Sequence, residues 1–109
     1  MQHVISFKRL ADFGAKHPDA AVSLQHWYKA VKGASWRNFG DVRSMFGSAD
    51  VAGQCVVFNL GGNKFRLIAA VHYPRAAKKG GWTLGRVYVR SILTHREYEK
   101  GAWKRDCGC

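Results

Sequence analysis

The sequence predicts an α+β fold in which N-terminal helices pack on a small antiparallel β-sheet, with a short C-terminal helical turn. Three observations indicate this class. Apolar residues recur at helical spacing over 1–47, β-branched and aromatic runs alternate with turn residues over 51–94, and a short helix and tail fit 95–109. The chain has 109 residues and no long linker, so we expect a single domain over 1–109.

Three helices are expected in the first half. Ser6 is suited to cap a helix that reaches about Lys16, and His17-Pro18 should end it because the residue before proline avoids the α conformation. Pro18 suits the first turn of a second helix, which Gly33 can terminate. A short third helix is expected over 38–45.

Three strands are expected after residue 50, over 54–60, 64–73 and 86–93. Gly61-Gly62-Asn63 suits a hairpin between the first two, because glycine adopts positive φ at little cost. The strand over 64–73 is apolar at most positions and should lie centrally, which favours a satisfied core histidine at His72.

The third strand and its flanks carry three further expectations. Alternation places Val87, Val89 and Ser91 on one face, and Arg86, Tyr88, Arg90 and Ile92 on the other. The preceding segment, 74–85, is predicted to be a mobile basic loop, in which Trp82 either stacks on a base or pins the loop. Thr94 and Glu97 predict a capping box for a helical turn over 95–100.

The charge distribution indicates a polyanionic partner. There are 18 Lys and Arg against 7 Asp and Glu, which gives a formal net charge of +11. No acidic residue occurs between Asp50 and Glu97, so the sheet half carries charge of one sign. The alternative is a solvated basic face without a ligand. The basic residues in this interval are Lys64, Arg66, Arg75, Lys78, Lys79, Arg86, Arg90 and Arg96.

Membrane and secreted classes are disfavoured. No run approaches the ~20 apolar residues that span a bilayer, and the N-terminus has no apolar stretch of signal-peptide length. A cytoplasmic location is therefore expected. Cys55 is predicted to be a buried thiol, and Cys107 and Cys109 to lie in a polar tail. The odd cysteine count and the cytosolic setting argue against a disulfide framework, and no ligand spacing predicts a metal or cofactor.

Two pairs of residues are candidates for chemistry. Arg66 and Arg90 lie inside strands, where a guanidinium could clamp a phosphate or simply cover the sheet with its stem. His95 and Tyr98 are three positions apart on the closing helical turn, so they share a face. His95 could transfer a proton or only cap the turn, and Tyr98 could contact a base or only pack against the sheet.

No enzyme nucleophile is indicated by the spacing of Ser, Cys, His and Asp residues. A cleavage reaction would then have to use a nucleophile from the substrate. In RNA the 2′-hydroxyl can attack the neighbouring phosphate, so the protein need only orient the backbone, move protons and stabilise charge.

The strand–turn–strand segment resembles a known signature. Residues 57–68 read VFNLGGNKFRLI, residues 87–90 read VYVR, and residues 94–99 read THREYE. Together they resemble the HigB branch of the RelE/ParE toxin superfamily. Two departures are Glu99, where Asp is commoner, and the length of the loop over 74–85.

This resemblance implies a RelE-like fold and a toxin of a type II toxin–antitoxin system that cleaves mRNA, typically on the translating ribosome. It implies a partner antitoxin of the HigA type with a helix-turn-helix domain. By motif position the RNA-facing residues would be Asn63, Lys64, Arg66, Arg90, His95 and Tyr98. The competing interpretations are a non-catalytic module that binds RNA or the ribosome, and a toxin that inhibits gyrase.

Overall fold

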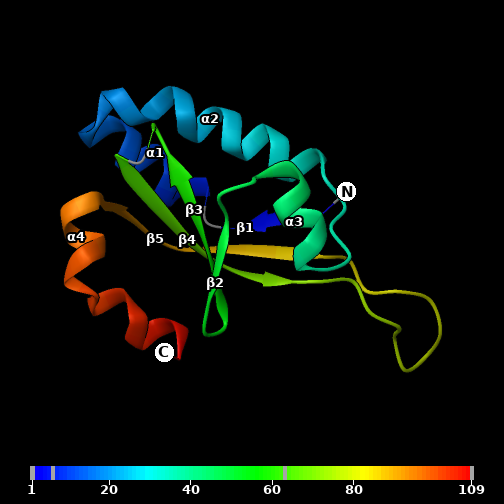
Figure 1. Cartoon of the computed structure of the whole chain (residues 1–109). Coiled ribbons are helices and arrows are strands. Elements are labelled where there is room, and N and C mark those ends of the chain that lie inside the picture. Colours follow the sequence, from blue (N-terminus) through cyan, green and yellow to red (C-terminus); the bar gives the residue numbers. More distant parts are fainter. Residues whose placement is uncertain (1, 6, 63, 109) are drawn as a thin grey trace.

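The described part of the chain is organised around a five-stranded sheet (Figure 1). The computed structural model describes residues 2–5, 7–62 and 64–108. The sheet has the order β1-β5-β4-β3-β2, in which β1 runs parallel to β5 and all other neighbours are antiparallel. The strands are β1 (His3–Ile5), β2 (Asp50–Ala52), β3 (Cys55–Leu60), β4 (Phe65–His72) and β5 (Arg86–Thr94).

Helices cover both faces of this sheet. Figure 1 shows α1 and α2 lying along one side, with α4 and the C-terminal segment on the opposite side. The predicted α+β class is confirmed, and the predicted helix bounds agree within a residue; Ser6 itself lies outside the described residues. The helices are α1 (Phe7–Lys16), α2 (Pro18–Gly33), α3 (Phe39–Met45), α4 (His95–Lys100) and a 3₁₀ helix, η1 (Ala102–Cys107).

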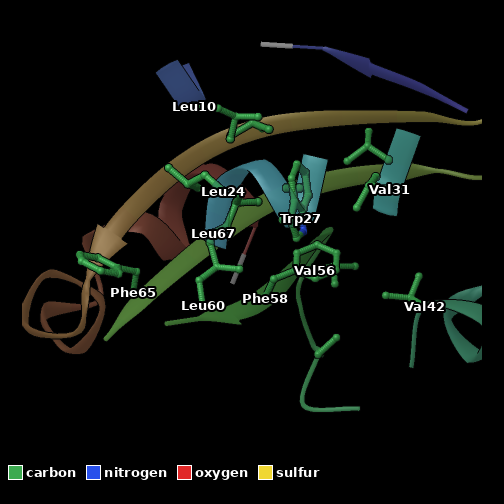
Figure 2. Packing of buried hydrophobic residues seen from close by; sticks show 14 of the residues in the cluster. Leu10, Leu24, Trp27, Val31, Val42, Val56, Phe58, Leu60, Phe65 and Leu67 are labelled. Carbon is green, nitrogen blue, oxygen red and sulfur yellow. The ribbon is translucent and has the colours of Figure 1, made fainter. Parts of the chain in front are cut away.

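The larger core lies between the sheet and the N-terminal helices (Figure 2). Trp27 of α2 meets Phe58 of β3 edge-on, with ring centroids 5.5 Å apart, and both side chains are fully buried. Because alternate strand residues share a face, Leu67 of β4 joins them while its neighbours point away. Burial of this apolar surface is the main contribution that holds the helices on the sheet.

A smaller core lies on the opposite face, under the C-terminal segment. It is formed by Cys55, Val57, Ile68, Trp103 and Cys107. Cys55 is buried, as predicted, but it forms a disulfide with Cys107, with the two Cα atoms 5.3 Å apart. The prediction that disulfides are absent is therefore wrong, because η1 folds back over the sheet and brings together two residues separated by 52 positions. Cys109 lies outside the described residues.

A β-bulge changes the predicted faces of β5. The register places Ser91 opposite Ile68 and Val89 opposite Ala69, so Arg90 is the additional residue of β5. The predicted alternation is therefore wrong beyond Arg90. Ile92 packs against the larger core instead of facing outward, and Ser91 moves to the opposite face.

The ends of the sheet also differ from expectation. The short strands β1 and β2, at the two edges of the sheet, were not predicted. His72 is exposed rather than buried, because β4 runs past the end of the core before the chain enters the loop over 74–85. In Figure 1 this loop extends away from the rest of the molecule.

Candidate functional site

Arg66 is the centre of a cluster on the face of the sheet that carries the C-terminal segment. It lies within β4, and only 8% of its surface is exposed. Its Nη2 atom lies 3.4 Å from Nδ1 of His95, and its Nη1 donates to the carbonyl of Phe65 at 3.3 Å. The guanidinium carbon lies over the ring of Tyr98, 5.0 Å from the centroid. Three predicted site residues therefore meet, from a strand and a helix 29 positions apart.

The start of α4 fixes His95 and Tyr98. The predicted capping box is confirmed: the Thr94 hydroxyl accepts from the Glu97 amide at 3.2 Å, and the Glu97 carboxylate accepts from the Thr94 amide at 3.0 Å. The backbone hydrogen bond from Thr94 lowers the pKa of the Glu97 carboxyl. Thr94, not His95, caps the helix, so the imidazole is available for side-chain contacts.

His95 has a polar partner at each ring nitrogen. Its Nε2 lies 2.9 Å from Oε1 of Glu99, one helical turn further on, and its Nδ1 faces Arg66. Both contacts are satisfied by the neutral tautomer in which Nε2–H donates to Glu99 and the Nδ1 lone pair points to Arg66. The His95 side chain is 52% exposed, so solvent and substrate can reach it. Glu99 was noted in the sequence only as a departure from a motif, and its i to i+4 spacing from His95 was the signal for this contact.

Trp103 supports Tyr98 from η1. The two rings stack with centroids 5.1 Å apart and planes 12° from parallel. The indole Nε1 of Trp103 donates to the carbonyl of Tyr98 at 2.9 Å, and the Trp103 side chain is buried in the smaller core. This residue was not predicted as part of the site, because nothing in the sequence indicates that the tail folds back onto the sheet.

The Cys55–Cys107 disulfide anchors the same segment. It joins β3 to the last residue of η1, and the Gln54 amide donates to the Cys107 carbonyl at 2.7 Å beside it. Arg66 and Trp103 both contact the ring of Tyr98, and the segment that carries Trp103 is covalently attached to the sheet through Cys107. The chemistry of such an arrangement is that of a buried, oriented cation beside an accessible imidazole.

Arg90 is not brought opposite Arg66. The register pairs Arg66 with Leu93, and Arg90 lies three residues away along β5, about 10 Å at ordinary strand rise. Its side chain is exposed, and its carbonyl accepts from Nη1 of Arg9 at 2.8 Å. This separation is set by the register between β4 and β5, which the residue types alone do not give.

The other predicted RNA-binding residues fall into two groups. Lys64 and Arg96 are exposed near His95, and the Lys64 carbonyl accepts from the His95 amide at 3.0 Å. The second group lies at the other end of the sheet, in the loop and at the start of β5; it comprises Arg75, Lys78, Lys79 and Arg86. Asn63 lies outside the described residues.

The described residues contain neither a cluster of metal ligands nor a helix able to span a membrane. Over 2–5, 7–62 and 64–108, no three His, Cys, Asp or Glu side chains gather as ligands of a metal ion would. None of the helices in these ranges has both the length and the hydropathy that crossing a bilayer requires.

Comparison with known proteins gives consistent matches over most of the chain. The sequence model of the HigB toxin family, described as the RelE-like toxic component of a toxin–antitoxin system, matches residues 20–101. The mRNA interferase HigB of Escherichia coli O6:H1 is 26% identical over 101 residues, which cover 90% of this chain and 89% of that protein. The mRNA interferase toxin HigB of Escherichia coli K12 and the mRNA interferase HigB of Shigella flexneri are each 26% identical over 100 residues, covering 89% of this chain and 88% of theirs.

Proposed function

Because the chain belongs to the HigB family of RelE-like toxins, we propose that it is an endoribonuclease that cleaves mRNA on the translating ribosome. The relatives named as mRNA interferases align with about nine-tenths of this chain. The reaction proposed is attack of the RNA 2′-hydroxyl on the adjacent phosphate, without a metal ion. It forms a cyclic phosphate and releases the 5′-oxygen of the next nucleotide.

The contact of Arg66 with both His95 and Tyr98 is the observation that carries this proposal. A cation held in a buried site beside a group that can exchange protons is what the reaction requires. Arg66 is held beside His95 and Tyr98 before substrate arrives, so only its Nη2–H has to turn to the phosphate as charge develops on the oxygens. We assign Arg66 to transition-state stabilisation.

His95 is the proposed proton acceptor. Glu99 accepts from Nε2, which leaves Nδ1 as the nitrogen that can take the proton of the 2′-hydroxyl. Arg66 then turns its Nη2 from Nδ1 to the phosphate, and Glu99 stabilises the resulting imidazolium. Glu99 is thus a positioning residue for His95, in the way that a carboxylate commonly orients an imidazole.

Tyr98 is proposed as a proton donor to the leaving 5′-oxygen. Its ring already has Trp103 stacked against it and the Arg66 guanidinium over it. These neighbours disfavour the alternative role of stacking on a base, because they already contact the ring. Lys64, Arg90 and Arg96 supply positive potential for the RNA backbone.

Membership of the family supports a proposal about the setting of the reaction. We propose a cytoplasmic protein that a HigA-type antitoxin with a helix-turn-helix domain neutralises. In a reducing cytoplasm the pair Cys55 and Cys107 would be held largely as thiols. The disulfide and dithiol forms are therefore both relevant to the activity.

Primer extension on a translated message tests the activity. Wild-type protein should produce discrete 5′ ends, and Arg66→Ala should abolish them. Lys29→Ala, which removes one exposed positive charge on α2, is the matched control and should cut normally. An intact message with wild-type protein would contradict the proposal.

The two alternative functions give different outcomes in the same experiment. A non-catalytic RNA- or ribosome-binding module would leave the message intact, and Arg66→Ala would only weaken its binding. A gyrase inhibitor would reduce DNA supercoiling without loss of mRNA.

A further inference from the structure

A second basic site lies at the opposite end of the sheet from Arg66. It is a cavity of about 640 Å³, within the range of pockets that hold small ligands. The cavity opens where β4 ends and β5 begins. We call it the loop pocket; the residues that concern its chemistry are His72, Tyr73, Arg75, Thr83, Arg86 and Tyr88.

Two aromatic residues and an arginine line the sheet side of the loop pocket. The rings of His72 and Tyr88 are in edge-to-face contact, with centroids 5.4 Å apart. Arg86 pairs with His72 in the β4–β5 register, so these residues are neighbours across two strands. His72 and Ala70 lie an even number of positions from Arg66 on β4, and Arg86 and Tyr88 pair with them, so His72, Arg86 and Tyr88 share the sheet face of Arg66. The C-terminal segment leaves this end of the face uncovered (Figure 1).

The loop side is held in place by local hydrogen bonds. The Thr83 hydroxyl accepts from the Arg75 amide at 3.1 Å, and the Thr83 amide donates to the Arg75 carbonyl at 2.8 Å. Ala76 and Trp82 form a further bridge between the two arms of the loop. The loop pocket is thus bounded by paired backbone on this side, and Arg75 is fixed at its rim.

Large apolar side chains of the loop remain exposed beside this pocket. Trp82 is 73% exposed and Leu84 69% exposed. The Trp82 side chain therefore does not pin the loop, which was one of the two interpretations of the sequence. An exposed indole next to basic residues is typical of surfaces on which nucleic-acid bases stack.

Charge at the loop pocket is positive. No acidic residue lines it. Among the described residues the ion pairs join Arg37 to Asp41 and His95 to Glu99, so neither Arg75 nor Arg86 forms a salt bridge there. Burial, and secondly the charge of Asp41, raises the pKa of the Tyr73 hydroxyl. Arg37 offsets that carboxylate at 3.1 Å. An anionic ligand is therefore favoured.

We infer that the loop pocket binds an unpaired nucleotide of single-stranded RNA, with the base against Tyr88 and the phosphate between Arg75 and Arg86. His72 and Arg66 are six residues apart on β4, so the two sites are about 20 Å apart at ordinary strand rise. The inference rests on the proposed function in that RNA is the polyanion. It adds a substrate contact remote from the scissile bond, which would hold a flanking nucleotide.

Fluorescence anisotropy with a labelled, 2′-O-methylated RNA oligomer tests this site. The modified RNA cannot be cut through its 2′-hydroxyl, so binding is read without cleavage. Tyr88→Ala and Tyr88→Leu should each weaken binding about tenfold, as loss of one stacked base predicts, and Leu retains apolar bulk for folding. Arg86→Ala should reduce the slope of log K against log [salt] by about 0.7, the value expected for one lost phosphate contact with a single strand. Lys29→Ala should bind within about twofold of wild type.

Inorganic polyphosphate serves as the second probe. It carries phosphate charge without bases, so the Tyr88 variants should bind it as wild type does, and Arg86→Ala should not. Equal RNA affinity for Tyr88→Leu and wild type would overturn the inference. An equal loss of affinity for RNA and polyphosphate in the Tyr88 variants would also overturn it. If wild type cleaves RNA and the Tyr88 variants bind it as wild type does, this inference alone is refuted. If the Tyr88 variants lose RNA binding but wild type cleaves no RNA, only the proposed function is refuted.

Discussion

Reducing the disulfide between Cys55 and Cys107 should destabilise the fold and loosen the site together. The bond closes a loop across a sequence separation of 52. In the chain-entropy treatment, restricting the unfolded chain over that length contributes about 4 kcal/mol, and measured values are commonly 2–4 kcal/mol, roughly. Both cysteines are buried in the smaller core, so the reduced thiols remain packed as small apolar groups. The loss should therefore come mainly from the unfolded state.

Urea unfolding with and without dithiothreitol measures this loss. With a slope of about 1.5 kcal/mol per molar for a small domain, a loss of about 3 kcal/mol moves the midpoint down by about 2 M. Cys107→Ala should lower the midpoint similarly without reductant and should respond little to adding it. Lys29→Ala, under the same conditions, should keep the full response to reductant.

Activity separates stability from positioning. The disulfide holds the end of η1, and Trp103 of η1 holds Tyr98 by a stack and a hydrogen bond. At a temperature where both forms are folded, the reduced protein should cleave RNA more slowly, with kcat affected more than KM. Identical urea midpoints for both redox forms would refute the stability argument. Unchanged kcat in the reduced protein would refute the argument that the bond positions Tyr98.

Three other changes have defined outcomes. His95→Gln should abolish RNA cleavage and leave the thermal midpoint nearly unchanged, since Thr94 caps α4; a large drop in the midpoint would contradict this assignment. Phe58→Ala should lower the free energy of unfolding by about 3–5 kcal/mol in urea titrations, because it leaves a cavity beside Trp27, and a loss below about 1 kcal/mol would show that the core collapses around it. Because the folded state lowers the pKa of Glu97, the ionised carboxylate contributes fully to the free energy of unfolding above the ordinary pKa of 4.5. That contribution is lost as the pH falls through the pKa of the folded state. Glu97→Gln keeps an acceptor for the Thr94 amide without titrating, so it should flatten this part of the stability profile between neutral and acid pH.

Local patterns carried most of the secondary structure. The second helix, the hairpin strands and the capping box are encoded by residues close in sequence, because caps, turns and periodic apolar faces act over a few positions. The strands β1 and β2 have three residues each, and they form only because a longer neighbour supplies their hydrogen bonds. No local pattern of that length distinguishes a strand from a loop.

The candidate site was predicted in composition but not in geometry. Arg66, His95 and Tyr98 were chosen from their residue types and spacing, and the structure brings them into contact. Arg90 was chosen in the same way, but the β4–β5 register places it three residues along β5 from Leu93, the partner of Arg66. Trp103 was not predicted, because its contact with Tyr98 depends on how the C-terminal segment folds onto the sheet.

The sequence by itself determined that this chain is basic, that its sheet half lacks acids, and that helices precede a hairpin sheet. These properties depend on residue types and on neighbours within a few positions. The tertiary structure decided that the C-terminal segment folds onto the sheet, that Cys107 bonds Cys55, and that the positive charge divides between the Arg66 cluster and the loop pocket. Those outcomes depend on strand register and on packing between segments distant in the chain, where one bulge or one folded-back tail changes which side chains meet.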